Sequence, residues 1–567
     1  LPRESWRPWV DRDRQWLESA MRRQPPVVGG FPERYLGGEA PAASNAEAFY
    51  GVLGLWAAQE AGSDVGRSAW QAIDYHWRAV QQRTPGDAPA GWALGYYNQQ
   101  GADPAVPAAL LAQGPPDPLM TVAGCVALSL TERYLGRPED RDRFDAPPGA
   151  SGNELAKGLA RLEQTFRLGG DRAPHEWYYR MWLIQRLGLA TGIREFNGID
   201  WVRDVTVELL NRRVSHGVWP GSGQAANAAV TTGFSLLYLG TILDPVAVSK
   251  LRLADAAWNN RPDDLAHFVD YASNQYEVET TFQVVNADAQ LLILQDAPLL
   301  WLSTNQAFSL SDAEIDNLRR YIELGGMLVT NAESGSEELR SFRQLYRDLF
   351  PDVTGDAGDD TPLSAVPRDH DIFSLHRTAQ SVPYVQMVDN GVRTLAVHFP
   401  RDIGRPLQRN DRLRSDAFAM LSNLYLYSVG YNPRRHRLEP RLVAVDPDVR
   451  PTRRVTAARV RHRGGFDPEP IFADQLTATA RNDARIDLTL SVRDPASLGN
   501  VDLAMLTVTG AVSDPLDDAE AQSLAAYLER GGTLWVDAAG GSREAVEAAR
   551  RVVEDVLPGA SLDPLPN

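Results

Sequence analysis

The chain has little cysteine and little lysine, and its acidic residues outnumber its basic ones. Cys125 is the one cysteine among 567 residues, which excludes a disulfide within the chain and a cysteine-based zinc cluster. Its apolar surroundings predict a core position. Lys157 and Lys250 are the only lysines, so 55 of the 57 basic residues (57 − 2) are arginine. The net charge of −17 opposes contact with nucleic-acid phosphates, and we expect no nucleic-acid partner.

The sequence patterns that mark cofactor and metal sites are also missing. There is no G-x-G-x-x-G or G-x-x-x-x-G-K-[ST] loop, so nucleotide binding has no support. The nine histidines are dispersed, and none belongs to an H-x-x-x-H or H-E-x-x-H pattern. We therefore predict neither a cofactor nor a metal ion.

No apolar run is long enough to cross a membrane. The longest charge-free segment ends in Ala228–Leu243, whereas a spanning helix needs about 20 apolar residues. This segment predicts a buried helix, and no transmembrane segment is expected. The chain opens with Leu1-Pro2-Arg3, which leaves open whether a targeting segment was removed or the sequence was trimmed.

Residues 1–245 show helical periodicity with aromatic residues on the apolar face. The predicted helices are 45–61, 120–135, 177–189 and 231–243, with glycine- and proline-containing breaks between them. Tryptophan is concentrated here, and two interpretations are open: the rings pack neighbouring helical hairpins together, or they line a ligand cavity. The candidate ligand-binding residues are Trp92, Tyr96, Tyr97, Trp177, Tyr178, Trp182, Trp201 and Trp219.

This module resembles the α/α repeats of squalene cyclases and prenyltransferases. The resemblance lies in Ser44-Asn45 leading into 52–58, then Trp70, Gly91-Trp92 and the segment 120–124. It implies a ring of helical hairpins, of which this chain would hold a part. The family's catalytic residues do not carry over: no D-x-D-D aspartate cluster occurs, and the zinc ligands of protein prenyltransferases are missing.

One strand–helix–strand unit occurs twice in the C-terminal half. Segments 299–303 and 327–330 predict buried parallel strands, and Ser311 caps a predicted helix at 311–323. We expect 299–303 to match 505–509 at an offset of 206, and 248–253 and 458–463 to be first strands. At this offset Asp312, Glu314, Leu318, Tyr321, Glu323, Gly325, Gly326 and Leu328 become Asp518, Glu520, Leu524, Tyr527, Glu529, Gly531, Gly532 and Leu534. The pattern predicts a duplicated doubly wound α/β unit.

The α/β units resemble the glutamine-amidotransferase-like, flavodoxin-like superfamily and, more narrowly, the bacterial domain-of-unknown-function family 4159. The resemblance is carried by segments 297–302, 325–328, 341–350 and 369–373. The predicted architecture is multidomain: an all-α helical-hairpin module that forms a partial α/α toroid, followed by two flavodoxin-like α/β units with parallel sheets. The predicted boundaries are 1–245, 246–435, an Arg-rich linker at 436–454, and a shorter second α/β domain at 455–567.

Polar residues follow the predicted strands of the first α/β unit. Ser303, Thr304, Asn305, Asn331 and Glu333 should rim the crevice at the carboxyl ends of the strands, the usual ligand site of such folds. At the offset of 206, Gly510 of the second copy occupies the position of Thr304 in the first. Neither copy has the cysteine elbow of an amidotransferase. A triad of Ser334, His370 and a neighbouring aspartate is conceivable, but a serine beside glycine is more often an N-cap, and no catalytic residue is predicted.

The segment 433–463 carries ten arginines against three acidic residues, a net charge of +7 (10 − 3). The arginines either bridge acidic faces of neighbouring domains or contact an acidic partner or anionic lipid headgroups. The candidate partner-binding residues are Arg434, Arg435 and Arg437. We expect partners to be proteins, with contact to a membrane surface as a further option.

Two functions are consistent with the sequence. The first is a non-catalytic scaffold or binding protein of a bacterial envelope-associated system, periplasmic or otherwise exported rather than cytoplasmic. The second is an enzyme that acts on an apolar, terpenoid-like or polymeric substrate held by the aromatic module. The first is favoured because catalytic residues are missing from both kinds of module, and because the two α/β copies diverge where a nucleophile would lie.

Overall fold

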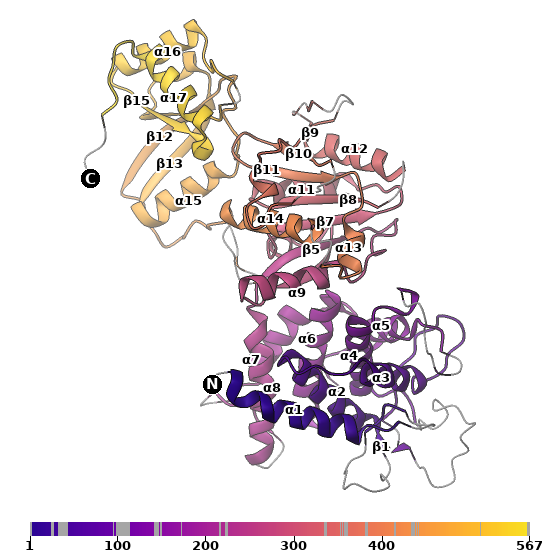
Figure 1. Ribbon diagram of the computed structural model, residues 1–567. Coiled ribbons are helices and arrows are strands. Elements are labelled where there is room, and N and C mark those ends of the chain that lie inside the picture. Colours follow the sequence, from indigo (N-terminus) through magenta and orange to yellow (C-terminus); the bar gives the residue numbers. More distant parts are fainter. Residues whose placement is uncertain are drawn as a thin grey trace. The chain divides into compact units, whose positions relative to one another are not determined.

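In the computed structural model, the chain forms two compact units (Figure 1). One comprises Leu1–Asp244 with Thr281–Val284, and the other comprises Pro245–Thr280 with Val285–Asn567. We call 3–244 the helical unit, 245–431 the first α/β region and 453–556 the second α/β region. The structure describes the chain except residues 1–2, 24–27, 32–42, 95, 98–113, 141–146, 148–149, 170, 172, 215–216, 222–224, 334–336, 352, 354, 357–360, 380–383, 413–415, 432–436, 438, 440–441, 511 and 564–567.

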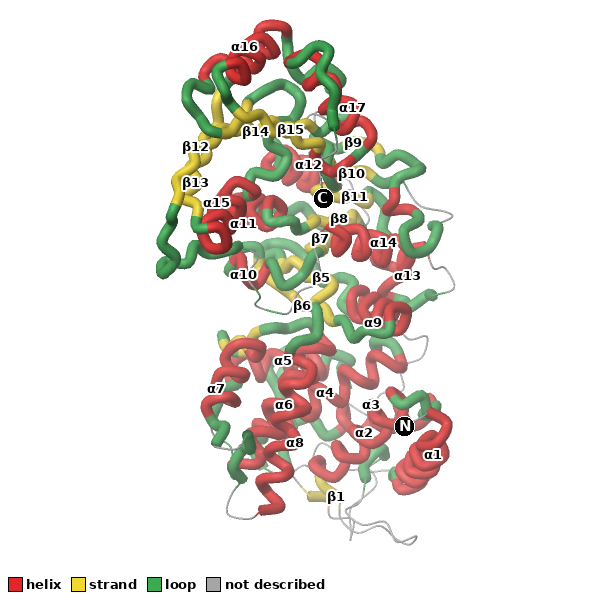
Figure 2. Tube along the Cα trace, turned by 90° about the vertical axis from the view of Figure 1, so that its left-hand side faces the viewer, coloured by secondary structure: helices red, strands yellow, loops and turns green. Residues whose placement is uncertain are grey.

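The helical unit is built almost entirely from helices that pack side by side (Figure 2). Helix α4 contacts α2, α3, α5 and α6, and α6 contacts α8, so every second helix packs on the next. These helices therefore form one all-helical module. Two local signals start the helices: Ser44 forms a capping box with Glu47, and Asp117 caps a helix that has Pro118 in its first turn. The elements are α1 (Arg3–Ala20), α2 (Asn45–Glu60), α3 (Arg67–Ala79), α4 (Pro118–Leu135), α5 (Glu154–Thr165), α6 (Pro174–Thr191), α7 (Thr206–Asn211), α8 (Ala225–Ile242) and the short strands β1 (Ala43–Ser44), β2 (Tyr96–Tyr97), β3 (Glu195–Phe196) and β4 (Ile199–Asp200).

Helix α8 corrects one prediction. The charge-free segment 228–243 was expected to be buried on all sides, but only one face packs, through Thr231, Ser235 and Tyr238. Apolar side chains on its other face are about half exposed, namely Val230, Leu236, Leu237 and Leu243. The prediction was wrong because an apolar composition does not reveal whether a neighbouring helix is present. None of the described helices combines the length and apolar content required to cross a bilayer.

A seven-stranded sheet forms the centre of the first α/β region, in the order β6-β5-β7-β8-β11-β10-β9. The pairs β5–β7, β7–β8 and β8–β11 are parallel, while β10 runs antiparallel to both its neighbours. Strands β7 and β8 are buried at every residue, as expected for strands covered on both faces. The strands are β5 (Val246–Arg252), β6 (Thr281–Asn286), β7 (Leu299–Thr304), β8 (Met327–Ala332), β9 (Ser364–Ala365), β10 (Gln386–Asp389) and β11 (Thr394–Phe399).

Helices cover both faces of this sheet (Figure 1). One face shares an apolar core with α10 (Leu291–Leu294), α11 (Asp312–Glu323) and α12 (Glu337–Leu349). The other face is covered by α9 (Asp264–Tyr276), α13 (Gly404–Gln408) and α14 (Asp416–Tyr431), which contact one another. Ring contacts join α9 to α14, for example Tyr271 with Phe418 at 5.1 Å between centroids.

The second α/β region has the same strand order in its four-stranded sheet, β13-β12-β14-β15, and every adjacent pair is parallel. Helices α16 and α17 share an apolar core with one face, and α15 contacts β13. By position in the chain and in the sheet, β12, β13, β14 and β15 correspond to β5, β6, β7 and β8. The elements are β12 (Arg453–Val460), α15 (Phe472–Ala484), β13 (Ile486–Arg493), β14 (Leu503–Val508), α16 (Asp518–Glu529), β15 (Thr533–Ala538) and α17 (Arg543–Val556).

The offset of 206 holds for the helix and the strand that follows it. Helices α11 and α16, and strands β8 and β15, begin and end at matching positions, and both helices start with a capping box. Each Gly-Gly turn lies against a tyrosine: a Cβ on Gly326 would come within 2.2 Å of the Tyr321 ring, and a Cβ on Gly532 within 2.3 Å of the Tyr527 ring. Only glycine fits there, which explains why the turn and the tyrosine recur together.

The predicted match of 299–303 with 505–509 was wrong by two residues. Leu299 pairs with Met327, while Leu503 pairs with Thr533, the residue equivalent to Met327. The strand offset is therefore 204 (503 − 299), because the loop 509–517 is two residues longer than the loop 305–311. In the sheet, Thr304 corresponds to Val508 rather than to Gly510.

Candidate functional site

A cluster of polar side chains lies at the carboxyl ends of β5, β7 and β8 in the first α/β region. The strand order reverses between β5 and β7, since α9 follows β5 on one face and α11 follows β7 on the other. In open α/β sheets such a reversal leaves a crevice in which ligands bind. The cluster combines predicted residues of β7 and β8 with residues from the loops that precede α9 and α13.

Ser303, Asn331 and Glu333 form the buried part of this cluster. Ser303 is the penultimate residue of β7 and pairs in register with Asn331 on β8. The Ser303 hydroxyl donates to Glu333 Oε1 at 2.7 Å, and Asn331 Nδ2 donates to Ser303 Oγ at 3.0 Å. All three side chains are buried. Burial raises the pKa of the Glu333 carboxyl, against the opposing effect of its hydrogen bonds to Ser303 and Asn260.

Three further residues complete the cluster, and none of them was predicted from the sequence. Asn260 Nδ2 donates to Glu333 Oε2 at 2.9 Å and to Asn305 Oδ1 at 2.9 Å. Arg261 Nη2 lies 2.9 Å from Asp402 Oδ2, and Asp402 Oδ1 accepts from Asn331 Nδ2 at 3.1 Å. The sequence signal was present, since these residues follow β5 and β11, whose carboxyl ends meet the same sheet edge as those of β7 and β8.

A buried ion pair joins β5 to the start of α9. Lys250 Nζ donates to Asp264 Oδ1 at 2.8 Å and to the carbonyl of Arg261 at 2.6 Å. Both side chains are buried, and burial raises the pKa of Asp264. Asp264 begins α9, so this pair fixes the start of the helix and the loop that carries Asn260 and Arg261.

The two remaining predicted residues lie at the edge of the cluster. Thr304 is buried, and its hydroxyl donates to the carbonyl of Ala257 at 2.9 Å and accepts from the amide of Gln306. It therefore shapes the loops and does not face solvent. Asn305 is exposed, and Arg261 and Asp402 are partly exposed. These three side chains, with Asn260, form the part of the cluster that a ligand can reach.

The second α/β region has different residues at the corresponding places. Ala539 corresponds to Glu333 and Asp537 to Asn331 at the offset of 206, and Thr507 corresponds to Ser303 at the strand offset of 204. Thr507 uses its backbone carbonyl to contact His462 Nε2 at 2.7 Å. The carboxylate at the centre of the first cluster therefore has no equivalent at Ala539.

Among the described residues, nothing brings His370 to the carboxyl end of β8, where the sequence suggested a triad. The His370 ring contacts Thr394 at the amino end of β11, whereas residue 333 follows the carboxyl end of the parallel strand β8. His370 and residue 333 therefore lie at opposite ends of the parallel strands. Ser334 lies outside the described residues.

In the helical unit, four of the five predicted ligand-binding tryptophans are buried and hydrogen-bonded to the backbone. The indole N–H groups of Trp92, Trp177, Trp201 and Trp219 donate to carbonyl oxygens at 2.7–2.8 Å. Such rings hold neighbouring segments together. Tyr178 is buried against Trp177, with 5.0 Å between their ring centroids. Trp182 is partly exposed and packs on Phe234, with 5.6 Å between the centroids. Tyr96 and Tyr97 form β2, and their side chains lie outside the described residues. Ligand binding by these aromatic residues stays a prediction.

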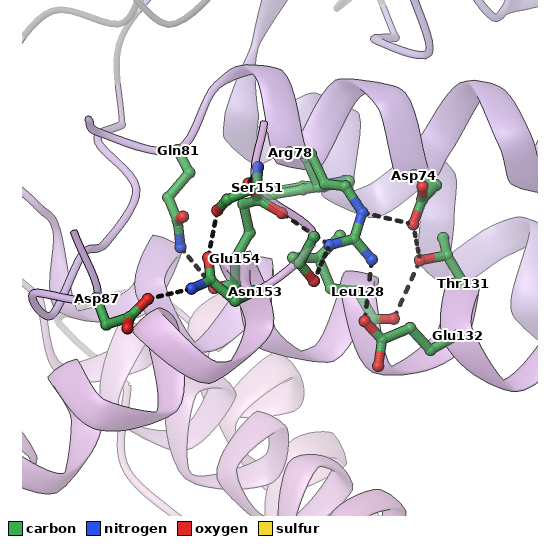
Figure 3. A network of polar contacts seen from close by, with 12 residues as sticks. Asp74, Arg78, Gln81, Asp87, Leu128, Thr131, Glu132, Ser151, Asn153 and Glu154 are labelled. Carbon is green, nitrogen blue, oxygen red and sulfur yellow. Dashed lines mark hydrogen bonds and ion pairs between the residues drawn. The ribbon is translucent and has the colours of Figure 1, made fainter. Parts of the chain in front are cut away.

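A buried ion network lies in the helical unit (Figure 3). The Arg78 guanidinium donates to Asp74, Glu132 and Glu154 at 2.9–3.1 Å, and all four side chains are buried. They come from α3, α4 and α5, so the network joins three helices. Its carboxylates face the arginine and not solvent, which is the geometry of a structural network.

Of the predicted partner-binding arginines, Arg437 is described and is 8% exposed. It therefore presents little surface to a partner. Arg434 and Arg435 lie outside the described residues, and their contact with a partner stays a prediction. Among the described residues, no group of three or more histidine, cysteine, aspartate and glutamate side chains is arranged to hold a metal ion.

Comparison with known proteins identifies the α/β part of the chain. No curated protein matches the sequence. The sequence model of one family, described as "Domain of unknown function (DUF4159)", matches residues 247–429 and 471–567. The first segment covers the strands and helices around the polar cluster, and the second covers α15 and the elements that follow it. The α/β part of this chain is therefore similar to the DUF4159 family, which its sequence was found to resemble.

Proposed function

We propose that the protein is a non-catalytic binding or scaffold protein of a bacterial envelope-associated system, and that its first α/β region binds a small hydroxyl-bearing ligand at the polar cluster. The single observation that supports this most is the comparison of the two α/β regions. They share strand order, helix caps and Gly-Gly turns, yet the second has Ala539 where the first has Glu333. The second region adopts the same fold without these polar residues. We therefore infer that the cluster of the first region serves ligand binding and not folding.

The accessible groups favour a ligand that both donates and accepts hydrogen bonds. Asn260 and Asn305 offer amide groups, Arg261 offers N–H donors, and Asp402 offers carboxylate oxygens. A hydroxyl group can donate and accept at once, so a sugar or polyol matches this mixed set better than a purely anionic ligand. Trp258 lies in the same loop as Asn260 and Arg261 and is partly buried. The guanidinium carbon of Arg252 lies over its ring, 5.5 Å from the ring centroid.

Binding is favoured over catalysis by the state of Ser303. Its hydroxyl hydrogen is directed to Glu333, its oxygen accepts from Asn331, and its side chain is 1% exposed. A nucleophile has to reach the atom that it attacks. Ser303 therefore fits the role of positioning Glu333 and Asn331 within the site.

We also propose the finer fold relationships that the sequence resemblances imply. The order β6-β5-β7-β8-β11 follows the 2-1-3-4-5 order of flavodoxin-like sheets, which supports a flavodoxin-like, glutamine-amidotransferase-like assignment of the first α/β region. The successive packing of α2, α4, α6 and α8 supports a part of a squalene-cyclase-type α/α ring for the helical unit. The envelope association and an exported location rest on these resemblances alone.

The test is a screen of sugars and polyols by thermal shift, followed by calorimetry on any ligand found. Arg261→Ala and Asn305→Ala should weaken binding by about tenfold each, as expected when a hydrogen-bonding partner is lost. The matched control is Asp537→Ala, at the equivalent edge of the second α/β region, which should leave affinity unchanged. Chemical conversion of a bound ligand, followed by NMR, would contradict the non-catalytic assignment. A ligand that binds all three variants equally would contradict the site.

A further inference from the structure

Strand β15 is an open edge of the second sheet. It pairs with β14 on one side, and among the described residues no strand pairs with its other side. Thr533, Trp535 and Asp537 are exposed, and Trp535 keeps 45% of its surface in contact with solvent. An edge strand with an exposed aromatic side chain is a template for pairing with another chain.

The first α/β region shows what occupies the equivalent place. Strand β8 corresponds to β15 residue for residue, and its outer edge pairs in parallel with β11, with Ala396 opposite Leu328 and Val397 opposite Val329. The equivalent residues of β8 are fully covered: Met327, Val329 and Asn331 are each at most 2% exposed. The same protein therefore contains both the covered and the uncovered form of this edge.

The sheet face at β15 is open for the same reason. In the first α/β region, α14 follows β11 in the chain and contacts β7 on the face to which Val329 belongs. On the corresponding face of the second sheet, Arg459, Met505 and Trp535 lie side by side in register. Helix α15 contacts β13, at the far side of that sheet. Trp535 is thus exposed where the first region has a strand and a helix.

We propose that β15 accepts an extended segment of another polypeptide, which adds to the sheet in parallel as β11 adds to β8. Main-chain hydrogen bonds would supply affinity, and alternate side chains would supply specificity. This rests on the proposed scaffold role of the protein, since it names the class of partner. It does not involve the polar cluster of the first α/β region.

The two regions also differ in a way that predicts the partner's sequence. On β11, His398 Nδ1 lies 2.7 Å from Thr330 Oγ1, whose hydroxyl lies 2.8 Å from that of Tyr346 on α12. The equivalent residues of the second region are Val536 and the buried Val552. A histidine opposite Val536 would lose its hydrogen bond in an apolar environment. The incoming strand should therefore carry an apolar residue at that position.

The probe is a fluorescein-labelled peptide with the sequence of residues 393–400 in which valine replaces His398. Binding to the full chain, measured by fluorescence anisotropy, should be saturable. The peptide with the original histidine should bind about five- to tenfold more weakly, because its imidazole loses a hydrogen-bond partner.

Trp535→Arg should weaken binding of the valine peptide by at least about tenfold. Val492→Arg is the matched control, since Val492 is 42% exposed on β13 at the opposite edge, and it should change affinity less than about twofold.

Several outcomes would overturn the inference. Equal binding of a scrambled peptide, no saturation, or equal effects of Trp535→Arg and Val492→Arg would each show that β15 does not select a strand. Self-association of the wild-type chain in sedimentation velocity, lost in Trp535→Arg, would assign the edge to a second copy instead. If the peptide fails while the ligand of the first α/β region still binds, the strand site is wrong and the proposed ligand site stands.

Discussion

The two α/β regions use the same residues to fold and different residues at their accessible edges. Both begin the helix after the third strand with a capping box, and both pack a tyrosine against a Gly-Gly turn. In the first region, polar side chains fill the carboxyl ends of the strands, and β11 covers β8. In the second, Ala539 replaces Glu333 and β15 is exposed. The residues that differ are therefore those that the fold does not require.

This contrast separates two kinds of buried position. Tyr321 and Tyr527 are buried in both regions and contact the same turn, so their burial is part of the architecture. At the position of Glu333, only the first region buries a carboxylate. Keeping it there requires hydrogen bonds from Ser303 and Asn260. A buried polar group that the sister fold omits is a better functional candidate than a shared apolar one.

The largest effect is expected from the shared tyrosines. Tyr321→Ala and Tyr527→Ala should each lower the free energy of unfolding of their own region by about 3–5 kcal/mol, since each removes a buried ring. Hydrogen exchange at β8 and β15 reports the two regions separately. Tyr321→Phe and Tyr527→Phe are the controls and should cost about 1–2 kcal/mol, because the ring stays and only the hydrogen bonds of the hydroxyl are lost. A much smaller loss for Tyr527→Ala would show that the two regions are not built alike.

The next effect is the dependence on pH that His398 gives to the stability of the first α/β region. Burial, with a contribution from Arg343, lowers the pKa of His398 to about 4, below the value of about 6.5 in an unfolded chain. The unfolded chain therefore binds the proton more readily than the folded one. The stability is fully present above pH 6.5 and is lost as the pH falls towards 4, by on the order of 2 kcal/mol between pH 7 and 5.

His398→Gln tests this dependence, because glutamine can still bond to Thr330 but does not titrate. Hydrogen exchange of β8 and β11, measured at pH 5 and 7, should show a smaller loss of protection in the variant. The second α/β region has Val536 and Val552 at the places of Thr330 and Tyr346, so the same substitution should leave β15 unaffected. An unchanged pH dependence at β8 would contradict a role for His398.

Local signals explain how much of the fold was predictable. The capping boxes and Gly-Gly turns lie within a few residues, so helices α11 and α16 followed from the sequence. The exposed face of α8 did not follow, because its apolar residues say nothing about whether a neighbour is present. The two-residue shift of β14 was missed because the loop after β14 is two residues longer than the loop after β7. Both strands are apolar, so their residue types do not reveal the extra length of the loop.

The candidate site was half predictable for a similar reason. Ser303, Asn331 and Glu333 come at the ends of strands that the apolar pattern revealed. Arg261 and Asp402 come from loops 141 residues apart, and only the parallel sheet brings them together. Sequence spacing cannot show such a contact, although examining the end of every predicted parallel strand would have included both residues.

A smaller effect on stability is expected when the first region is made to resemble the second. Glu333→Ala removes two hydrogen bonds, and we expect a loss of about 1 kcal/mol, since Ser303 and Asn260 can find other partners. The fold should persist, as it does in the second region with Ala539. Ligand binding at the cluster should be lost, as measured by calorimetry. A variant that unfolds would show that Glu333 is a structural residue of the first region.

The smallest effect is expected at Trp535. Because 45% of its surface is exposed and no described strand covers β15, Trp535→Arg should change the free energy of unfolding by no more than about 0.5 kcal/mol. Val329→Arg, at the equivalent position of β8, is the contrast: Val329 is fully buried, and an unpaired charge there should disrupt the first region. Thermal unfolding and hydrogen exchange of β15 measure the difference. If Trp535→Arg proved as disruptive as Val329→Arg, the tryptophan would be part of the core, and the open edge would not be a binding surface.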